Sequence, residues 1–313
     1  MPQSKSEISE VRTSTDYHSR RASDKLDIVA MKIGIDSYCY HRCFGEVYPQ
    51  QRPAARTMTL EDFLKRAHEL GVDGVSLESC YISRDTGYLR HIREVLDDYK
   101  LDRVWAWGHR DGLEGGASES AFQEMIAHFE YARILGAQVM RVVGSSRKFR
   151  NQPHGPQLER LTRMLRRAVP AAEGCGIRMA IENHIDFTSD EILRLVEDVG
   201  SPYLGVNFDT GNFVRLLDDP IKGMAKLAHY TYATHIKDLN VRKGVAADEW
   251  YFFSSVPVGE GIVDNTALVR LLAAAGYTGL LAVEIDFLHP DYGEDEDAAV
   301  ARSVEALKRI AAV

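Results

Sequence analysis

A unit made of one short β-type run and one helical stretch repeats along the chain from Met31 onward. Several helical stretches end at a glycine, the residue that commonly follows a helix, and the next β-type run begins shortly afterwards. Eight runs are predicted to be strands: residues 31–37, 74–79, 103–107, 138–143, 179–182, 204–208, 233–237 and 280–284. Strands that alternate with helices pair in parallel, and eight such units in 313 residues favour a closed barrel over an open sheet.

We therefore predict an α/β fold, a (β/α)8 or TIM barrel that forms a single metal-binding domain over residues 31–313. No GxGxxG or GxxxxGK(S/T) segment follows the first strand, which argues against a doubly wound nucleotide-binding sheet. Residues 1–30 are polar and mixed in charge, without the apolar segment of a standard secretory signal. We expect these residues to form a disordered leader.

Charge and composition limit the class of partner. The net charge of −8 argues against nucleic acid, because phosphate binding needs a basic face. No apolar stretch approaches the length of about 18 residues that a transmembrane helix needs, so no membrane span is expected. The four cysteines show no CxxC spacing, and a chain of this size needs no disulfide bonds, so we expect reduced thiols and a cytoplasmic location.

Acidic and histidine side chains stand at the ends of the last four predicted strands. Chemistry in a (β/α)8 barrel takes place at the C-terminal ends of the strands, which can direct side chains to one point near the axis. The candidate metal ligands are Glu182, Asp209, His235 and Glu284. Three carboxylates gathered without a cation would repel one another, so the pattern predicts one bound divalent metal. We favour Mn²⁺, with Mg²⁺, Co²⁺ or Zn²⁺ as alternatives, because oxygen donors with one imidazole suit these ions.

A second polar side chain lies two positions from each of these ligands, on the same face of a strand. These side chains are His184, Asn207, Lys237 and Asp286. His184 is the candidate catalytic base, because an unperturbed imidazole titrates near neutral pH. Lys237 could supply positive charge to a developing oxyanion. Asn207 and Asp286 are candidates for substrate binding.

Three further residues near strand ends are candidates for substrate binding. His41 follows the first strand, where contact with a substrate and packing within the loop are both open. Trp107 and His109 are predicted to lie on one face of the third strand together with Trp105. Aromatic rings at a barrel mouth can stack on a sugar, although strand tryptophans also suit packing against a helix.

Arg141 in the fourth predicted strand is a candidate for substrate binding that also needs a carboxylate partner. An unpaired cation inside a barrel is costly, and Glu78 or Glu182 could neutralise it. His154 lies in the proline- and glycine-containing segment 151–156, where we expect a loop residue rather than a metal ligand.

Five short segments resemble the strand-end motifs of the xylose isomerase-like barrel superfamily. They are Ile-Glu-Asn-His at 181–184, Asn-Phe-Asp-Thr-Gly-Asn at 207–212, Thr-His-Ile-Lys-Asp at 234–238, Val-Gly-Glu-Gly at 258–261 and Leu-Ala-Val-Glu-Ile at 281–285. Sugar phosphate isomerases and epimerases, hydroxypyruvate isomerase, inosose dehydratase and ketose 3-epimerases belong to this superfamily. The resemblance covers the chain from Met31 to its C-terminus and implies the same four metal ligands.

Two departures bear on the reaction that the resemblance implies. Ketose 3-epimerases carry a histidine shortly after the ligand of the sixth strand, where this chain has Gly211 and Asn212. A proton exchange between two glutamates, as in those enzymes, would still be open to Glu182 and Glu284 as catalytic residues. His184, by contrast, is a feature that those enzymes do not need.

A narrower resemblance is to the larger subunit of bacterial C-glycoside deglycosidases. It rests on His184 together with the segments 36–46 and 284–292. Those enzymes cleave 3-oxo-C-glycosides with a metal held in such a barrel, and they pair with a small second subunit. The resemblance implies a small partner subunit for this chain, with a homo-oligomer as the alternative.

Together these observations predict a divalent-metal-dependent carbohydrate enzyme that abstracts the proton next to the carbonyl of an oxo-sugar. The preferred outcome is a lyase that cleaves 3-oxo-glycosides; the alternatives are a sugar or sugar phosphate isomerase or epimerase, and then an inosose-type dehydratase. The endonuclease branch of the superfamily would need extra histidine ligands and a basic face. A binding module without activity would be expected to lack at least one ligand, and all four are present.

Overall fold

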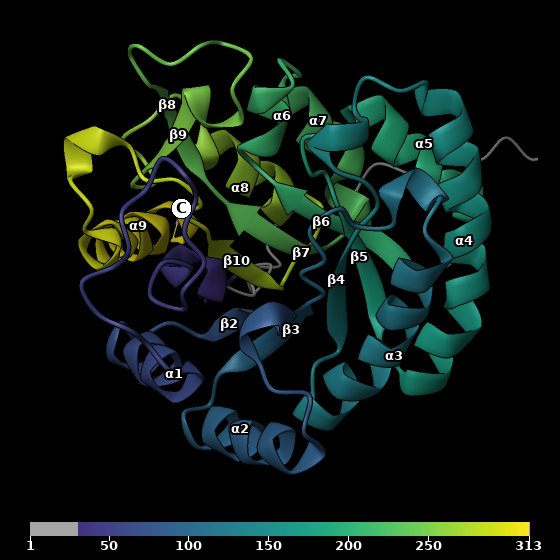
Figure 1. Cartoon of the computed structure of the whole chain (residues 1–313), viewed down its shortest axis with the longest axis horizontal. Coiled ribbons are helices and arrows are strands. Elements are labelled where there is room, and N and C mark those ends of the chain that lie inside the picture. The colour runs from purple at the N-terminus through teal and green to yellow at the C-terminus, as the bar shows by residue number, and fades with distance from the viewer. Residues whose placement is uncertain (1–30, 313) are drawn as a thin grey trace, which may run out of the picture.

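The computed structural model describes residues 31–312, and the predicted leader at residues 1–30 lies outside this range. Eight parallel strands close into a central barrel in the order β1-β10-β7-β6-β5-β4-β3-β2 (Figure 1). The strands are β1 (Lys32–Asp36), β2 (Gly74–Glu78), β3 (Asp102–Ala106), β4 (Val139–Val143), β5 (Arg178–Glu182), β6 (Leu204–Asp209), β7 (Thr231–Ile236) and β10 (Leu280–Val283). The prediction of a (β/α)8 barrel is confirmed, and each predicted strand overlaps one of these eight.

Helices form an outer ring around the barrel (Figure 1). They are α1 (Leu60–Glu69), α2 (Thr86–Asp98), α3 (Glu119–Leu135), α4 (His154–Cys175), α5 (Ser189–Val199), α7 (Pro220–Leu227), α8 (Asn265–Ala274) and α9 (Glu296–Ala311), whereas the short α6 (Asn212–Arg215) lies at the barrel mouth. The glycine signals locate several helix ends correctly: Gly136 and Gly200 cap α3 and α5 with φ of 85° and 66°, a conformation that other residues adopt only under strain. No helix within residues 31–312 is long and apolar enough to span a membrane.

The inside of the barrel changes from apolar to charged along the strands. Val104, Val139, Ala180, Ala233 and Leu280, from five different strands, form a buried apolar cluster. Alternate residues of a strand face the same side, so the side chains that follow them on the inner face are polar ones nearer the C-terminal strand ends. Among these are Arg141, Glu182, His235 and Glu284. The strands thus carry a layer of charged side chains next to this apolar cluster, on the side of their C-terminal ends.

A two-stranded antiparallel hairpin, β8 (Asp238–Val241) and β9 (Phe253–Val256), follows β7. It stands at the mouth of the barrel, at the top of the view in Figure 1. At the end of the hairpin, the backbone carbonyl of Asp248 accepts a hydrogen bond from Arg147 in the loop after β4. The hairpin carries no short turn signature, because 11 residues, 242–252, separate its strands.

His154 begins α4, so the prediction of a loop residue at this position is wrong. Pro156 is compatible with this helix start because the backbone N–H groups of a first turn have no partner within the helix. The two ring nitrogens of His154 lie 2.7 Å from Glu191 Oε1 and 2.7 Å from the carbonyl oxygen of Arg150. Both partners are acceptors, so both contacts are satisfied only when the imidazole carries two protons.

The His154 contact is expected to make stability depend on pH. Burial alone would lower the pKa of His154, but the hydrogen bonds to Arg150 and Glu191 outweigh it and raise the pKa. A pKa raised by folding stabilises the folded state fully below the unfolded pKa, and the contribution is lost as the pH rises through the folded pKa. The pH-dependent part of the stability lost in His154→Ala should be about 0.5–1 kcal/mol at acidic pH and vanish in the alkaline range. Urea unfolding of both proteins at about pH 5.5 and pH 8.5 measures it; an equal difference at both pH values would contradict the doubly protonated ring.

Candidate metal centre

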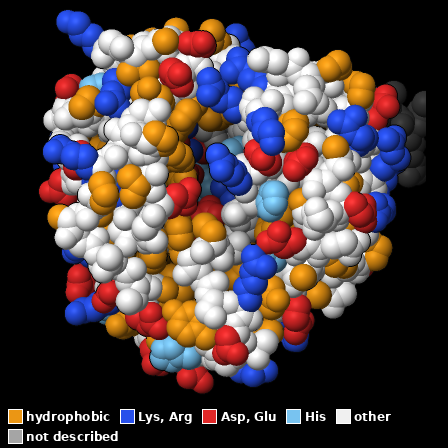
Figure 2. Space-filling view, in the orientation of Figure 1, with side chains coloured by type: hydrophobic (Ala, Val, Ile, Leu, Met, Phe, Trp, Pro, Cys, Tyr) orange, Lys and Arg blue, Asp and Glu red, His pale blue; other side chains and the backbone are white. Residues whose placement is uncertain are grey.

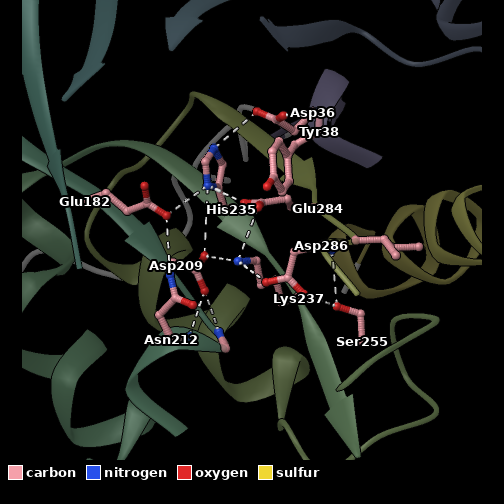
Figure 3. Close-up of polar contacts among 12 residues, drawn as sticks. Asp36, Tyr38, Glu182, Asp209, Asn212, His235, Lys237, Ser255, Glu284 and Asp286 are labelled. Carbon is pink, nitrogen blue, oxygen red and sulfur yellow. Dashed lines mark hydrogen bonds and ion pairs between the residues drawn. The ribbon is translucent and has the colours of Figure 1, made fainter. Parts of the chain in front are cut away.

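Four side chains from neighbouring barrel strands meet at the C-terminal end of the barrel (Figure 3). Glu182 ends β5, Asp209 ends β6, His235 lies in β7 and Glu284 follows β10. Each offers one ligand atom, and the four atoms lie within 4.8 Å of one another. All four residues are buried. The structure therefore brings together the complete set of predicted metal ligands.

The surface is hollowed at this end of the barrel. Figure 2 shows the hollow near the middle of the view, with acidic, basic and histidine side chains gathered in and around it. The same view looks onto the barrel mouth in Figure 1. The hollow therefore lies on the face of the molecule at which the strands of the four candidate ligands end.

The imidazole of His235 is held between this cluster and a fourth carboxylate. Its Nδ1 lies 2.5 Å from Glu284 Oε2 and 3.3 Å from Glu182 Oε1. Its Nε2 lies 3.3 Å from Asp36 Oδ2 at the end of β1 (Figure 3). A carboxylate on the far nitrogen is the usual partner of a metal-binding histidine, because it fixes the tautomer and the orientation of the ring.

Asp209 is oriented by the backbone that follows β6. Its Oδ1 accepts hydrogen bonds of 2.8 Å from the N–H groups of Gly211 and Asn212, where α6 begins. The side chain of Asn183 bonds both the N–H and the carbonyl of Asp209, at 2.8 and 2.9 Å. These contacts turn Oδ2 of Asp209 towards the cluster.

Lys237 brings a buried positive charge into the cluster. Its Nζ lies 2.8 Å from Asp209 Oδ2, 3.2 Å from Glu284 Oε1 and 3.0 Å from Asp286 Oδ2 (Figure 3). Burial alone would lower the pKa of Lys237, but the three carboxylates outweigh it and raise the pKa well above its ordinary value. Lys237 is therefore a stable cation at neutral pH.

Asp286, predicted to bind substrate, is occupied by other side chains. Arg215 of α6 donates a hydrogen bond to each of its two carboxylate oxygens, at 2.5 and 2.9 Å, and Ser255 of β9 donates to Oδ1 at 2.8 Å. Arg215 is itself buried. The Arg215–Asp286 pair thus ties α6, the hairpin and the segment after β10 together beside Lys237.

Arg141 has both of the carboxylate partners that its position in the barrel required. Its side chain lies 2.7 Å from Glu182 Oε2 and 3.2 Å from Glu78 Oε1. Burial raises the pKa of Glu78 to about 8, although Arg141 opposes the shift. Arg141 therefore forms an ion pair with Oε2 of Glu182, whose Oε1 faces His235.

His184 lies just outside the cluster and is partly exposed. Strand β5 ends at Glu182, and Ile185 has a φ of 46°, so the alternation of faces that predicts the position of His184 stops two residues before it. Its Nδ1 is buried and has no hydrogen-bond partner within residues 31–312. Burial lowers the pKa of His184, and the nearby Glu182 opposes this. The ring is therefore neutral at neutral pH and can accept a proton.

The remaining predicted residues divide into free and occupied groups. Both amide atoms of Asn207 are buried and have no hydrogen-bond partner in the described part of the chain. The same holds for Nε1 of Trp107 and Nδ1 of His109. The rings of Trp107 and His109 are stacked with centroids 5.2 Å apart, whereas Trp105 turns outward to His128 of α3. Both nitrogens of His41 are occupied, at 3.0 Å from the Tyr38 carbonyl and 3.0 Å from Gln51.

The donor set fits a divalent cation. Three carboxylates and one imidazole combine hard oxygen donors with a nitrogen donor, as Mn²⁺, Mg²⁺, Co²⁺ and Zn²⁺ accept. Burial makes the mutual repulsion of three carboxylates costly. Residues 64–310 also match the family of the xylose isomerase-like TIM barrel.

The chain belongs to this xylose isomerase-like TIM barrel family. It is 26% identical to the 3-oxo-isoapionate decarboxylase of Pectobacterium atrosepticum over 158 residues, which are 50% of this chain and 54% of that protein. The match thus spans about half the length of that relative. The chain is 24% identical to an inosose dehydratase of Clostridium beijerinckii over 236 residues, 68% of this chain and 76% of the relative.

Solved structures of the xylose isomerase-like family show the same fold. A xylose isomerase domain protein from Planctomyces limnophilus superposes with a TM-score of 0.70 over 90% of this chain and 96% of that chain. The two sequences are 20% identical, so the similarity concerns the fold.

Asp36 and Arg215 lie at the candidate metal centre but are not among the site residues predicted from the sequence. Asp36 ends the first strand, and the same strand-end criterion that found the other acids would have found it. Arg215 lies on a helix of four residues and meets Asp286 71 positions further along the chain, so no local pattern indicates it.

Proposed function

We propose that the protein is a divalent-metal-dependent carbohydrate enzyme that removes the proton next to the carbonyl of an oxo-sugar. The observation that carries this proposal is the meeting of Glu182, Asp209, His235 and Glu284 within 4.8 Å at the barrel mouth. The neutral, partly exposed imidazole of His184 supports it, because the site combines a cation-binding cluster with a proton acceptor.

A cation held by the four ligands, Mn²⁺ in our proposal, would act as a Lewis acid towards a carbonyl oxygen of the sugar. The imidazole of His184 would accept the neighbouring C–H proton. Lys237 would remain protonated and offset negative charge that develops on the carbonyl oxygen. The free amide of Asn207 would donate to and accept from sugar hydroxyls and so orient the ring.

For the second half of the reaction we favour departure of the substituent β to the carbonyl, which makes the enzyme a lyase acting on 3-oxo-glycosides. Two relatives support a bond-breaking outcome, since one is named a decarboxylase and the other a dehydratase. Return of the proton to another face or carbon, as in an isomerase or epimerase, is the second candidate, and inosose-type loss of water the third. A small second subunit, or a second copy of this chain, remains the proposed partner.

The proposal is tested with manganese-loaded protein in D₂O, using 3-oxo-glucosides with C- and O-linked aglycones and simple ketoses. Release of the aglycone would support the lyase. Deuterium in a ketose together with an isomer or epimer would support the second candidate. Absence of both exchange and release, with and without metal, would refute proton abstraction.

The charges at the centre favour a substrate without a phosphate group. The cations that the structure places there, Arg141, Lys237 and Arg215, are each in contact with at least one buried carboxylate. A phosphate at the centre would have to displace one of these carboxylates or lie buried beside them uncompensated, and both are costly.

The 6-phosphate of an accepted oxo-sugar is therefore expected to react at least about 100-fold less efficiently than the free sugar. Measurement of kcat/KM for the two compounds under the same metal concentration tests this. Similar values would show that a cation outside this set receives the phosphate.

A further inference from the structure

Tyrosine hydroxyls and one carboxylate form a connected chain beside the metal centre. The hydroxyl groups of Tyr38 and Tyr48 are hydrogen-bonded to each other, and either can be the donor. The Tyr38 hydroxyl also lies 3.2 Å from Glu46 Oε1, and Tyr81 donates to Glu46 Oε2 at 2.6 Å. Glu46 is exposed and Tyr48 is partly buried. A line of exchangeable protons thus leads from solvent to Tyr48.

Tyr48 packs against the hairpin and Phe287, close enough to Asp286 and Lys237 to feel their charges. Its ring centroid is 4.9 Å from that of Trp250 in the hairpin and 6.1 Å from that of Phe287. Phe287 directly follows Asp286, whose carboxylate is 3.0 Å from Lys237. Burial raises the pKa of Tyr48, on which the charges of Asp286 and Lys237 also act, so the phenol stays protonated at neutral pH.

The loop after β1 fixes this phenol. Gln51 Oε1 accepts from the N–H of Tyr48 at 3.1 Å and contacts His41 Nε2 at 3.0 Å. The ring of His41 is stacked on that of Tyr38 with centroids 5.0 Å apart. His41 is thereby a positioning residue that holds both tyrosines in place.

The tyrosine chain and His184 stand on opposite sides of the barrel mouth. Tyr38 follows β1 and His184 follows β5, and these strands are four positions apart in either direction around the closed barrel. In Figure 3, Tyr38 and Glu182 lie on opposite sides of His235. A proton acceptor on one side and a proton donor on the other suit a reaction that removes a proton and expels a group.

We propose that Tyr48 is the proton donor to the departing group, and that Tyr38 and Glu46 restore its proton from solvent. The inference rests on the proposed lyase reaction. The C–H bond breaks, its proton passes to His184, and its electron pair forms a C=C bond. The bond to the β-substituent breaks with its electrons on the substituent, which takes the proton of Tyr48. Tyr48 takes the proton of Tyr38, and water restores that proton through Glu46, so the sum is an elimination without an oxidant.

The test uses Tyr48→Phe in the full, manganese-loaded chain with two 3-oxo-glucosides, one that releases methanol and one that releases 4-nitrophenol. Methoxide is strongly basic and needs a proton to leave, so kcat/KM for the methyl glucoside should fall by about 100- to 1000-fold. 4-Nitrophenolate leaves without a proton, so its release should change by less than about threefold. Exchange of the α-proton in D₂O should persist, and Tyr38→Phe should show the same dependence on the leaving group.

Tyr81→Phe is the matched control, since it removes a phenol hydroxyl that contacts Glu46 without lying between Glu46 and Tyr48. It should cleave both glucosides like the wild type. If the wild type is active and Tyr48→Phe lowers kcat/KM equally for both glucosides, or for neither, the assignment of Tyr48 is wrong while the proposed function stands. A wild type that neither exchanges nor cleaves any oxo-sugar would overturn the proposed function, and this assignment with it.

Discussion

Glu182→Gln and Asp209→Asn are each expected to weaken Mn²⁺ binding by more than about 100-fold, beyond what loss of a supporting residue costs. Turnover of the oxo-sugar should fall by about 1000-fold or more, because polarisation by a metal is worth several kcal/mol. Both replacements keep the shape of the side chain. In Asp209→Asn, the amide oxygen would still accept the hydrogen bonds from the N–H groups of Gly211 and Asn212, so the loss should reflect the ligand rather than the fold.

Titration calorimetry with Mn²⁺, together with aglycone release, checks this result. Glu173→Gln is the matched control, because Glu173 is an exposed acid on α4. Thermal unfolding of each variant shows whether the fold is retained. Full activity with a folded Glu182→Gln or Asp209→Asn protein would mean that the metal centre is wrongly assigned.

His184→Gln is expected to lower the rate of α-proton exchange by about 100- to 10,000-fold, the range for loss of a general base. Mn²⁺ affinity should stay close to that of the wild type, because His184 is not one of the four ligands. This combination separates the base from the metal centre, since the ligand variants lose both properties.

Deuterium uptake by the substrate measures the exchange, and His91→Gln, an exposed histidine on α2, is the control. Exchange at the wild-type rate in His184→Gln would point to the carboxylate pair Glu182 and Glu284 instead. That outcome would favour the epimerase candidate over the lyase.

The barrel and the cluster of four candidate ligands at its mouth could be predicted because both follow from local patterns. Each strand is a short apolar run after a helix stop, and each ligand stands where such a run ends. The alternation of side chains then carries Glu182, Asp209, His235 and Glu284 to the inner face. The partners of Arg141 were also foreseeable, because its position inside the barrel requires a carboxylate and Glu78 and Glu182 end nearby strands.

The parts that escaped prediction depend on contacts between distant segments. The Arg215–Asp286 pair joins residues 71 positions apart, and nothing in a four-residue helix indicates that its arginine is buried. The hairpin β8–β9 is stabilised by its place at the mouth, including the contact of Ser255 with Asp286, rather than by a turn motif. The proline and glycine that flank His154 predict a loop, but a proline in a first helical turn costs no backbone hydrogen bond, so the helix can begin there.

The ammonium group of Lys237, in contact with Asp209, Glu284 and Asp286, has a consequence for the life of the protein in a cell. A small zinc domain does not fold without its ion, because the free energy of metal binding supplies the free energy of folding. Here the chain carries its own counter-ion into the ligand cluster. We therefore expect the chain to fold without a metal, with Lys237 neutralising part of the negative charge that a bound cation would otherwise neutralise.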